Sequence, residues 1–212
     1  MPCDTARVGT AVDPNGRLYR GQSPQHREAE RTARFLDAGL DVFGTQGFHA
    51  ATVDSLCATA GLTKRYFYQS FGSMEALFHA VYLRCTDSIM QIATASEHRP
   101  GDALVGLNRF FDVIEADPRV ARIVLVEVFD ISPATDEVAR KAMDAFVDQT
   151  ERSFATKPLT GVDSRLVAHG LVGAMHYIAR QWLQSGYTQP RAEVAASCHV
   201  LFAAVRAHFD AS

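Results

Sequence analysis

The sequence predicts an all-α protein. Apolar residues recur at spacings of three and four along most of the 212-residue chain, which places them on one face of a helix. Sustained alternation of apolar and polar residues, the pattern of a strand, does not occur in the sequence. Glycine and proline separate the periodic segments, at points where helices end and turns begin. We therefore expect a bundle of helices without a β-sheet.

Composition excludes several other classes of protein. The chain is 47% hydrophobic and 21% charged, which is ordinary for a globular protein and excludes a largely disordered or collagen-like chain. Its 21 Lys and Arg against 24 Asp and Glu give a net charge of -3, so no broad basic field is expected. Residues 1–75 hold 8 basic and 8 acidic side chains, and the rest hold 13 and 16, so the acidity belongs to the C-terminal part.

No segment of the sequence is suited to a membrane. The N-terminus lacks the apolar stretch of a secretory signal. The most apolar later stretch, Val120 to Phe129, contains Arg122 and Glu127 and is far shorter than the roughly 20 residues that cross a bilayer. We expect a cytoplasmic protein.

The first helix has clear end signals. Residues 1–22 have no periodicity and predict a flexible arm. Ser23 followed by Pro24 combines an N-cap hydroxyl with a first-turn proline, and Gly47 follows the last periodic residue. Between these ends an apolar stripe is formed by Phe35, Leu36, Gly39, Leu40, Val42 and Phe43.

Two short helices follow. Thr52 caps a helix over residues 53–60, and Asp54 in its first turn suits the positive end of the helix dipole. Gly61 interrupts the helix, and Thr63 caps a second one over residues 64–70. Two short capped helices joined by a three-residue glycine turn indicate a helix-turn-helix. The remaining helices are expected at about 74–96, 102–115, 118–130, 134–156, 163–185 and 190–210.

The second short helix has side chains that can read DNA. Phe67 and Phe71 are four apart and face inward, which leaves an outer face of Lys64, Arg65, Tyr66 and Gln69. Lysine and arginine can pair with guanine, glutamine with adenine, and tyrosine with phosphate or a thymine methyl group. The hydroxyl and N–H groups at the helix starts Thr52 and Thr63 can bind phosphate oxygens. We expect three carboxylates of this N-terminal part to face away from the basic residues: Asp37, Asp41 and Asp54. The alternative is that the helix only packs onto a neighbour, leaving its basic residues as a solvated edge.

The segment from Arg31 to Phe78 resembles the DNA-binding region of the tetracycline-repressor (TetR) family. The resemblance covers 48 residues, RTARFLDAGLDVFGTQGFHAATVDSLCATAGLTKRYFYQSFGSMEALF. It implies an all-helical homodimer with a DNA-binding domain, here residues 23–73, and a C-terminal ligand-binding and dimerisation domain, here residues 74–212. By position, Thr52 and Tyr68 match phosphate-contacting residues of the family.

The resemblance also has two departures. Met74 stands where the family usually has a lysine near a phosphate, so one backbone contact is missing or supplied from elsewhere. Arg7, Arg17, Arg20 and Arg27 in and after the arm could replace it. Arg65 and Tyr66 stand where small residues are common, which suggests an unusual operator sequence.

The last two helices are apolar on more than one face, so each must be buried on more than one face. The resemblance implies that they form a four-helix bundle across a dimer axis, through about residues 163–210. Trp182, Phe202 and Phe209 are candidates for core or interface anchors.

A ligand cavity is expected between the middle helices. Apolar walls would come from Phe110, Phe111, Ile114, Val124, Phe129, Met143, Phe146 and Tyr177. The residues that we select as ligand contacts are Asn108, Phe111, Glu127, Phe146, His176 and Tyr177. The alternative for each is ordinary core packing.

Catalytic and metal motifs are missing from the sequence. It contains no Glu-x-x-His, no His-Glu-x-x-His and no glycine-rich phosphate loop. His169 and His176 share a helix face, but no third ligand stands at suitable spacing. The four cysteines lie far apart and are expected as free, mostly buried thiols: Cys3, Cys57, Cys85 and Cys198. We expect no cofactor.

These observations predict a ligand-responsive transcriptional regulator, a repressor, which is not an enzyme. It would bind a palindromic operator as a homodimer and be released by a small, largely apolar effector. The alternatives are a helical small-molecule or metal-binding bundle or enzyme that does not read DNA, and a regulator-like fold that has lost DNA binding.

Overall fold

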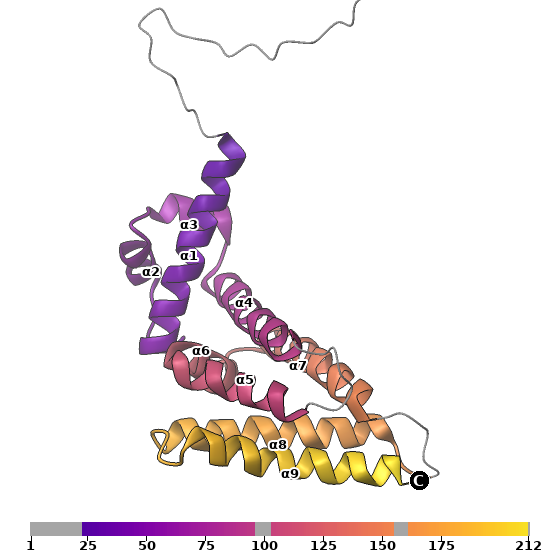
Figure 1. The fold of residues 1–212 in the computed structure, drawn as a ribbon. Helices are drawn as coiled ribbons and strands as arrows, with labels where there is room; N and C mark the ends of the chain where they lie inside the picture. Colours follow the sequence, from indigo (N-terminus) through magenta and orange to yellow (C-terminus); the bar gives the residue numbers. More distant parts are fainter. Residues whose placement is uncertain (1–22, 96–102, 155–160, 212) are drawn as a thin grey trace, which may run out of the picture.

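The computed structural model describes residues 23–95, 103–154 and 161–211. Within these ranges the chain forms nine α-helices, one π-helix and no strand, so the predicted fold class is confirmed (Figure 1). The predicted arm of residues 1–22 lies outside the described residues, as does Cys3. None of the described helices is both long enough and apolar enough to cross a membrane.

The N-terminal unit consists of α1 (Pro24–Gln46), α2 (Val53–Ala60) and α3 (Lys64–Ser70), with the predicted bounds. The Ser23 hydroxyl accepts a hydrogen bond from the His26 N–H and so caps α1. Thr52 and Ser55 form a reciprocal capping box at the start of α2. These local hydrogen bonds explain why the helix starts could be located in the sequence.

Aromatic side chains form the core of this unit and extend it into α4 (Met74–Thr94). Phe35 of α1 and Phe67 of α3 are fully buried and pack edge to face, with ring centroids 5.6 Å apart. Phe43 packs in the same way on Phe78 of α4, at 5.3 Å. Because α4 continues past the N-terminal unit, its far half lies among the C-terminal helices (Figure 1).

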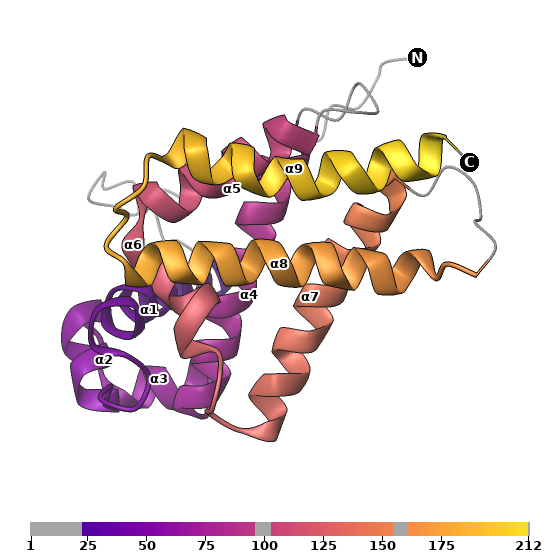
Figure 2. The same ribbon diagram turned by 90° about the horizontal axis from the view of Figure 1, so that it is seen from below.

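The C-terminal part contains α5 (Ala103–Ala116), α6 (Pro118–Arg122), η1 (Ile123–Glu127), α7 (Pro133–Phe154), α8 (Ser164–Gln184) and α9 (Arg191–Asp210). Figure 2 shows α8 and α9 side by side, and Figure 1 places them on the side opposite α2 and α3. Trp182 and Phe209 are buried within the chain, and Phe202 packs partly buried beside them. Trp182 and Phe209 are therefore core residues.

The expectation of one α-helix over residues 118–130 is wrong. The segment is a five-residue α-helix followed by the π-helix η1. Three successive residues of η1 are buried, because η1 packs against α1, α4 and α8 at once: Ile123, Val124 and Leu125. Such π-turns are rare and occur often at functional sites.

The end of α1 touches α6 closely at Gly44. A Cβ atom placed on Gly44 would lie 2.4 Å from the Cβ and 2.8 Å from the Cα of Arg119. The Arg119 guanidinium also pairs with Asp41 of α1 and with Asp117, whose carboxylate caps α6. Because Gly44 has no side chain, the backbone of α1 packs directly against Arg119 of α6.

We predict that Gly44→Ala destabilises the protein although alanine favours helices. The added methyl group must push α6 away, at a cost of about 1–3 kcal/mol, which exceeds the gain of about 1 kcal/mol in helix propensity. Thermal unfolding monitored by circular dichroism at fixed protein concentration measures the change. Gly106→Ala in α5 is the matched control, because its Cβ would meet only the Ala93 carbonyl at 3.4 Å. A Gly44→Ala protein as stable as Gly106→Ala would contradict the prediction.

Candidate DNA-binding surface and ligand cavity

One face of α3 is exposed, and its opposite side is anchored in the core. Phe67 is fully buried, and Phe71 is partly buried against the same core. All six predicted DNA-contacting residues from this helix and its cap are exposed: Thr63, Lys64, Arg65, Tyr66, Tyr68 and Gln69. The structure therefore brings these six side chains onto the accessible side of the helix-turn-helix.

The turn between α2 and α3 is held by α1. Gly61 adopts a left-handed conformation, with φ of 61° and ψ of 38°, in which a side chain would be strained. The Arg34 guanidinium on α1 donates to the carbonyl oxygens of Ala60 and Gly61. A Cβ on Gly61 would also lie 2.7 Å from this guanidinium. The direction of α3 is thus fixed by a backbone turn and by one arginine.

Lys64 is paired with a carboxylate on α2. Its Nζ lies 2.7 Å from an Asp54 oxygen, and the two side chains are 55% and 75% exposed. The hydrogen bond from the ammonium to Asp54 raises the pKa of Lys64, so the lysine remains charged. The expectation that Asp54 faces away from the basic residues is wrong, because the angle between α2 and α3 brings it to the start of α3. Asp37 and Asp41 do face elsewhere, toward Arg84 and Arg119.

The other exposed residues of α3 differ in whether a neighbouring side chain contacts them. The Arg31 guanidinium of α1 lies 4.7 Å from the centre of the Tyr66 ring, a cation–π contact. Within the described part of the chain, Arg65 forms no ion pair or hydrogen bond. Arg65 is therefore the basic group of this helix whose charge is not compensated by a neighbour.

The helix starts leave hydroxyl groups accessible. Thr63 caps α3 without a side-chain hydrogen bond, and the exposed Thr52 hydroxyl oxygen accepts from the Ser55 N–H, so its own proton is still available. Met74 is partly buried and packs against the core. The position where the resembled family usually has a lysine is thus occupied by a residue that packs against the core.

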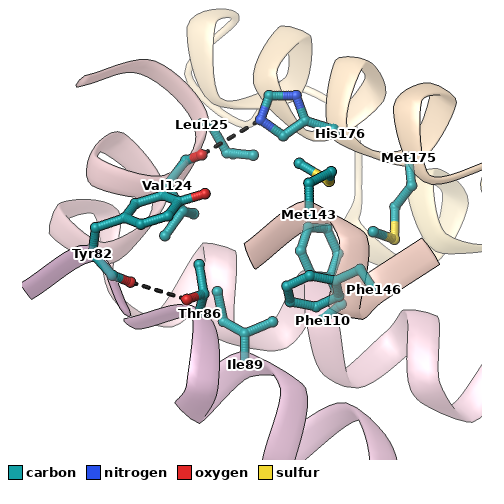
Figure 3. Close-up of a pocket in the computed structure, with 10 residues that line it drawn as sticks. All are labelled: Tyr82, Thr86, Ile89, Phe110, Val124, Leu125, Met143, Phe146, Met175 and His176. Carbon is teal, nitrogen blue, oxygen red and sulfur yellow. Dashed lines mark hydrogen bonds between the residues drawn. The ribbon is translucent and has the colours of Figure 1, made fainter. Parts of the chain in front are cut away.

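A cavity lies between α4, α5, η1, α7 and α8, in the region predicted (Figure 3). The empty space within it amounts to about 400 Å³, a volume that includes open solvent. Its lining residues are Tyr82, Thr86, Ile89, Phe110, Val124, Leu125, Met143, Phe146, Met175 and His176. Burial lowers the pKa of His176, so its imidazole is neutral, and Nε2 lies 3.4 Å from the Val124 carbonyl oxygen.

Two of the six residues selected as ligand contacts line this cavity, namely Phe146 and His176. The other four lie elsewhere. Asn108 donates to the Leu104 carbonyl of its own helix, and Phe111 is fully buried against Trp182. Glu127 contacts the N-terminal unit, and Tyr177 is 64% exposed on the outer side of α8.

The sequence reasoning missed the contribution of α4 to the cavity. Tyr82, Thr86 and Ile89 are spaced by four and three, which is equally typical of an ordinary core stripe. No local signal distinguishes an apolar residue that faces a neighbour from one that faces a cavity.

Comparison with known proteins identifies the family. The family model described as bacterial regulatory proteins, tetR family, matches residues 35–81, from the middle of α1 into α4. The HTH-type transcriptional activator FasR of Mycolicibacterium smegmatis is 31% identical over 165 residues, which cover 74% of each chain. The chain belongs to the TetR family of transcriptional regulators. The predicted function class is thereby confirmed, and these relatives are regulators, not enzymes.

Two solved structures share the fold of this TetR-family protein. A tetR-family transcriptional regulator from Streptomyces coelicolor is 21% identical with a TM-score of 0.71, over 86% of this chain and 83% of that chain. The transcriptional regulator FadR from Bacillus subtilis, solved in complex with stearoyl-CoA, is 14% identical with a TM-score of 0.70. That match covers 80% of this chain and 96% of that chain.

In this TetR-family regulator, η1 connects the cavity to the N-terminal unit. Val124 and Leu125 line the cavity, whereas Glu127 at the end of η1 accepts a 2.8 Å hydrogen bond from the Phe48 N–H. The second Glu127 oxygen accepts from Arg122, which also donates to the Thr45 carbonyl at the end of α1. The five-residue η1 therefore lines the cavity at one end and contacts the N-terminal unit at the other.

The described residues give no support to a metal site. Within residues 23–95, 103–154 and 161–211, no three His, Cys, Asp or Glu side chains are grouped so as to hold a metal ion. His169 is exposed, and His176 lies at the cavity. The described cysteines are free and buried, as predicted: Cys57, Cys85 and Cys198.

We predict that Asp54→Asn strengthens the binding of duplex DNA. The substitution removes a negative charge beside α3 and frees Lys64 to contact a phosphate. The affinity at low salt should rise several-fold, and the slope of log Kd against log salt should steepen by about one ion. Fluorescence anisotropy with random-sequence duplex DNA measures both quantities. Asp87→Asn, which alters an exposed carboxylate on α4, is the control with the same charge change. Equal salt slopes for the two variants would contradict the prediction.

Proposed function

We propose that this regulator binds a palindromic operator as a homodimer and is released by an effector with a long apolar chain. Residues 23–73 would form the DNA-binding domain, and residues 74–212 the domain for ligand binding and dimerisation. The observation that carries the proposal is the exposed face of α3, held rigidly by Phe67 in the core and by Arg34 at the turn. The proposed DNA contacts are Thr52, Thr63, Lys64, Arg65, Tyr66, Tyr68 and Gln69.

The proposed dimer interface is the outer face of α8 and α9. Leu166, Gly170, Gly173 and Tyr177 are spaced by four, three and four, so they form one stripe along α8. Leu166 is 67% and Tyr177 64% exposed, and a Cβ on either glycine would meet nothing within 4 Å. On α9, Val200 is 65% exposed. Apolar side chains flanking open glycines suit close packing against the same face of a second copy.

A dimer through this face accounts for an operator with two half-sites. Figure 1 shows that α8 and α9 lie on the side of the molecule away from α2 and α3. In a two-fold dimer both recognition helices would contact the same side of a duplex, at major grooves about 34 Å apart or a multiple of that distance. The operator should therefore be a palindrome.

We predict that selection from a random duplex library yields a palindrome for the wild type, and that Tyr177→Glu weakens binding to it by about 100-fold or more. The variant places a charge in the apolar interface, so each monomer binds one half-site and the gain from bivalency is lost. Light scattering should report a monomer. Ala145→Glu, on an exposed position of α7, is the control and should remain dimeric. Failure to select any DNA sequence would favour the alternative bundle that does not read DNA.

The proposed effector is a molecule with a long acyl chain. The cavity is lined mainly by aliphatic, aromatic and methionine side chains, and it is bounded by η1, which reaches the N-terminal unit. FadR, which shares the fold, was solved with stearoyl-CoA. An effector that fits the cavity better when η1 is displaced would lower the population of the DNA-binding conformation. We propose that the DNA-bound form represses transcription, although FasR is named an activator. A promoter-reporter assay measures the direction.

We predict that stearoyl-CoA releases the selected operator, whereas coenzyme A without an acyl chain does not. Met143→Trp should abolish this release, because the larger side chain fills the cavity, and it should leave operator affinity without ligand unchanged. Anisotropy titrations of the labelled operator measure both effects. Tight operator binding by the wild type at saturating stearoyl-CoA would contradict the proposed effector class.

A further inference from the structure

Arg31 of α1 and Tyr66 of α3 meet at the exposed face of the recognition helix. The central guanidinium carbon of Arg31 lies 4.7 Å from the centre of the Tyr66 ring. A cation in this position is attracted by the electron-rich face of the ring. One of the proposed DNA contacts of α3 is therefore held by a side chain from another helix.

The core beneath this pair fixes the two points from which the side chains extend. Arg31 and Phe35 are four apart on α1, so they lie on the same face of that helix. On α3, Tyr66 directly precedes Phe67. Phe35 and Phe67 are both fully buried and pack edge to face, with ring centroids 5.6 Å apart. The Arg31–Tyr66 contact thus continues the α1–α3 packing from the core to the surface.

The Arg31 guanidinium has no competing partner among the described residues. Within residues 23–95, 103–154 and 161–211 it forms no ion pair and no hydrogen bond, although Glu28 stands three positions before it on α1. Arg34, the next arginine, instead donates to the carbonyl oxygens of Ala60 and Gly61. The contact that Arg31 makes is with the Tyr66 ring, so its charge acts on that ring.

A tyrosine ring held in this way suits a thymine. In the major groove thymine is the base that presents a methyl group, and apolar side-chain surfaces contact it. Tyr66 is 37% exposed, so part of its ring is accessible to a base. A ring that is already oriented loses less conformational freedom on binding than one that rotates freely. Holding the ring therefore favours discrimination for one base pair.

We propose that Arg31 is a specificity-determining residue of this regulator. It holds the Tyr66 ring so that the uncovered part of the ring packs against a thymine methyl group at one position of each operator half-site. Arg31 acts through Tyr66 and is thus a positioning residue. This inference rests on the proposed function in one respect, that α3 reads an operator. It adds a residue of α1 to the recognition surface and names the base that the pair selects.

The experiment removes the methyl group and the guanidinium separately. Each thymine of the selected operator is replaced in both half-sites by deoxyuridine, which lacks only the 5-methyl group. Fluorescence anisotropy measures the ratio of Kd for the substituted and unsubstituted duplexes with the wild type, Arg31→Gln and Tyr66→Ala. Arg27→Gln is the matched control, because it removes the same charge one turn earlier on α1, at an exposed position. Thermal unfolding shows that the variants are folded.

At one thymine of each half-site, loss of the methyl group should weaken wild-type binding by about fourfold per half-site, the size expected for one buried methyl group. The ratio should fall by at least about twofold in Arg31→Gln, since an exposed cation–π contact is lost. It should approach unity in Tyr66→Ala. Arg27→Gln should keep the wild-type ratio, whatever its affinity for both duplexes. A merely structural role of Arg31 would lower both affinities alike and leave the ratio unchanged.

Three results would overturn this inference while leaving operator binding intact. The first is a wild type that is insensitive to the loss of every thymine methyl group. The second is a wild-type ratio at every thymine in Arg31→Gln, and the third is an equal fall of the ratio in Arg27→Gln. A selection that yields no DNA sequence at all would instead overturn the proposed function.

Discussion

The position of the recognition helix depends on how the end of α1 is held against α6 and η1. Gly44 lets the backbone of α1 come against Arg119, and the Glu127 carboxylate accepts the N–H of Phe48 just beyond α1. Arg34, earlier on the same helix, holds the turn before α3. Since α1 carries both sets of contacts, it links η1 directly to the turn before α3.

The π-helix η1 also connects this arrangement to the cavity. Ile123, Val124 and Leu125 of η1 are buried in succession against three helices, and Glu127 at its end accepts the N–H of Phe48. The cavity and the N-terminal unit thus share one short element. A ligand acts on such an element only through a difference in affinity between its two conformations.

Local signals in the sequence accounted for most of the fold. Ser23 and Thr52 marked helix starts because a hydroxyl cap needs only the next few residues, and Gly47 and Gly61 marked ends for the same reason. Thr63 also marks a start, although its hydroxyl makes no capping hydrogen bond. Contacts between distant residues could not be found in this way. The Glu127 bond spans 79 positions, the pairing of Asp54 with Lys64 depends on an interhelical angle, and the cavity-facing side of Tyr82 is identical in pattern to a core stripe.

The pairing of Lys64 with Asp54 also bears on how the protein is distributed along a genome. Attraction to phosphates acts on every sequence alike, and a genome offers about 10⁶–10⁹ competing sites. With one of the two basic groups of α3 paired to its own neighbour, dwell times on unrelated DNA would be shortened. Fewer copies would then be sequestered away from the operator, and a smaller cellular pool would keep it occupied.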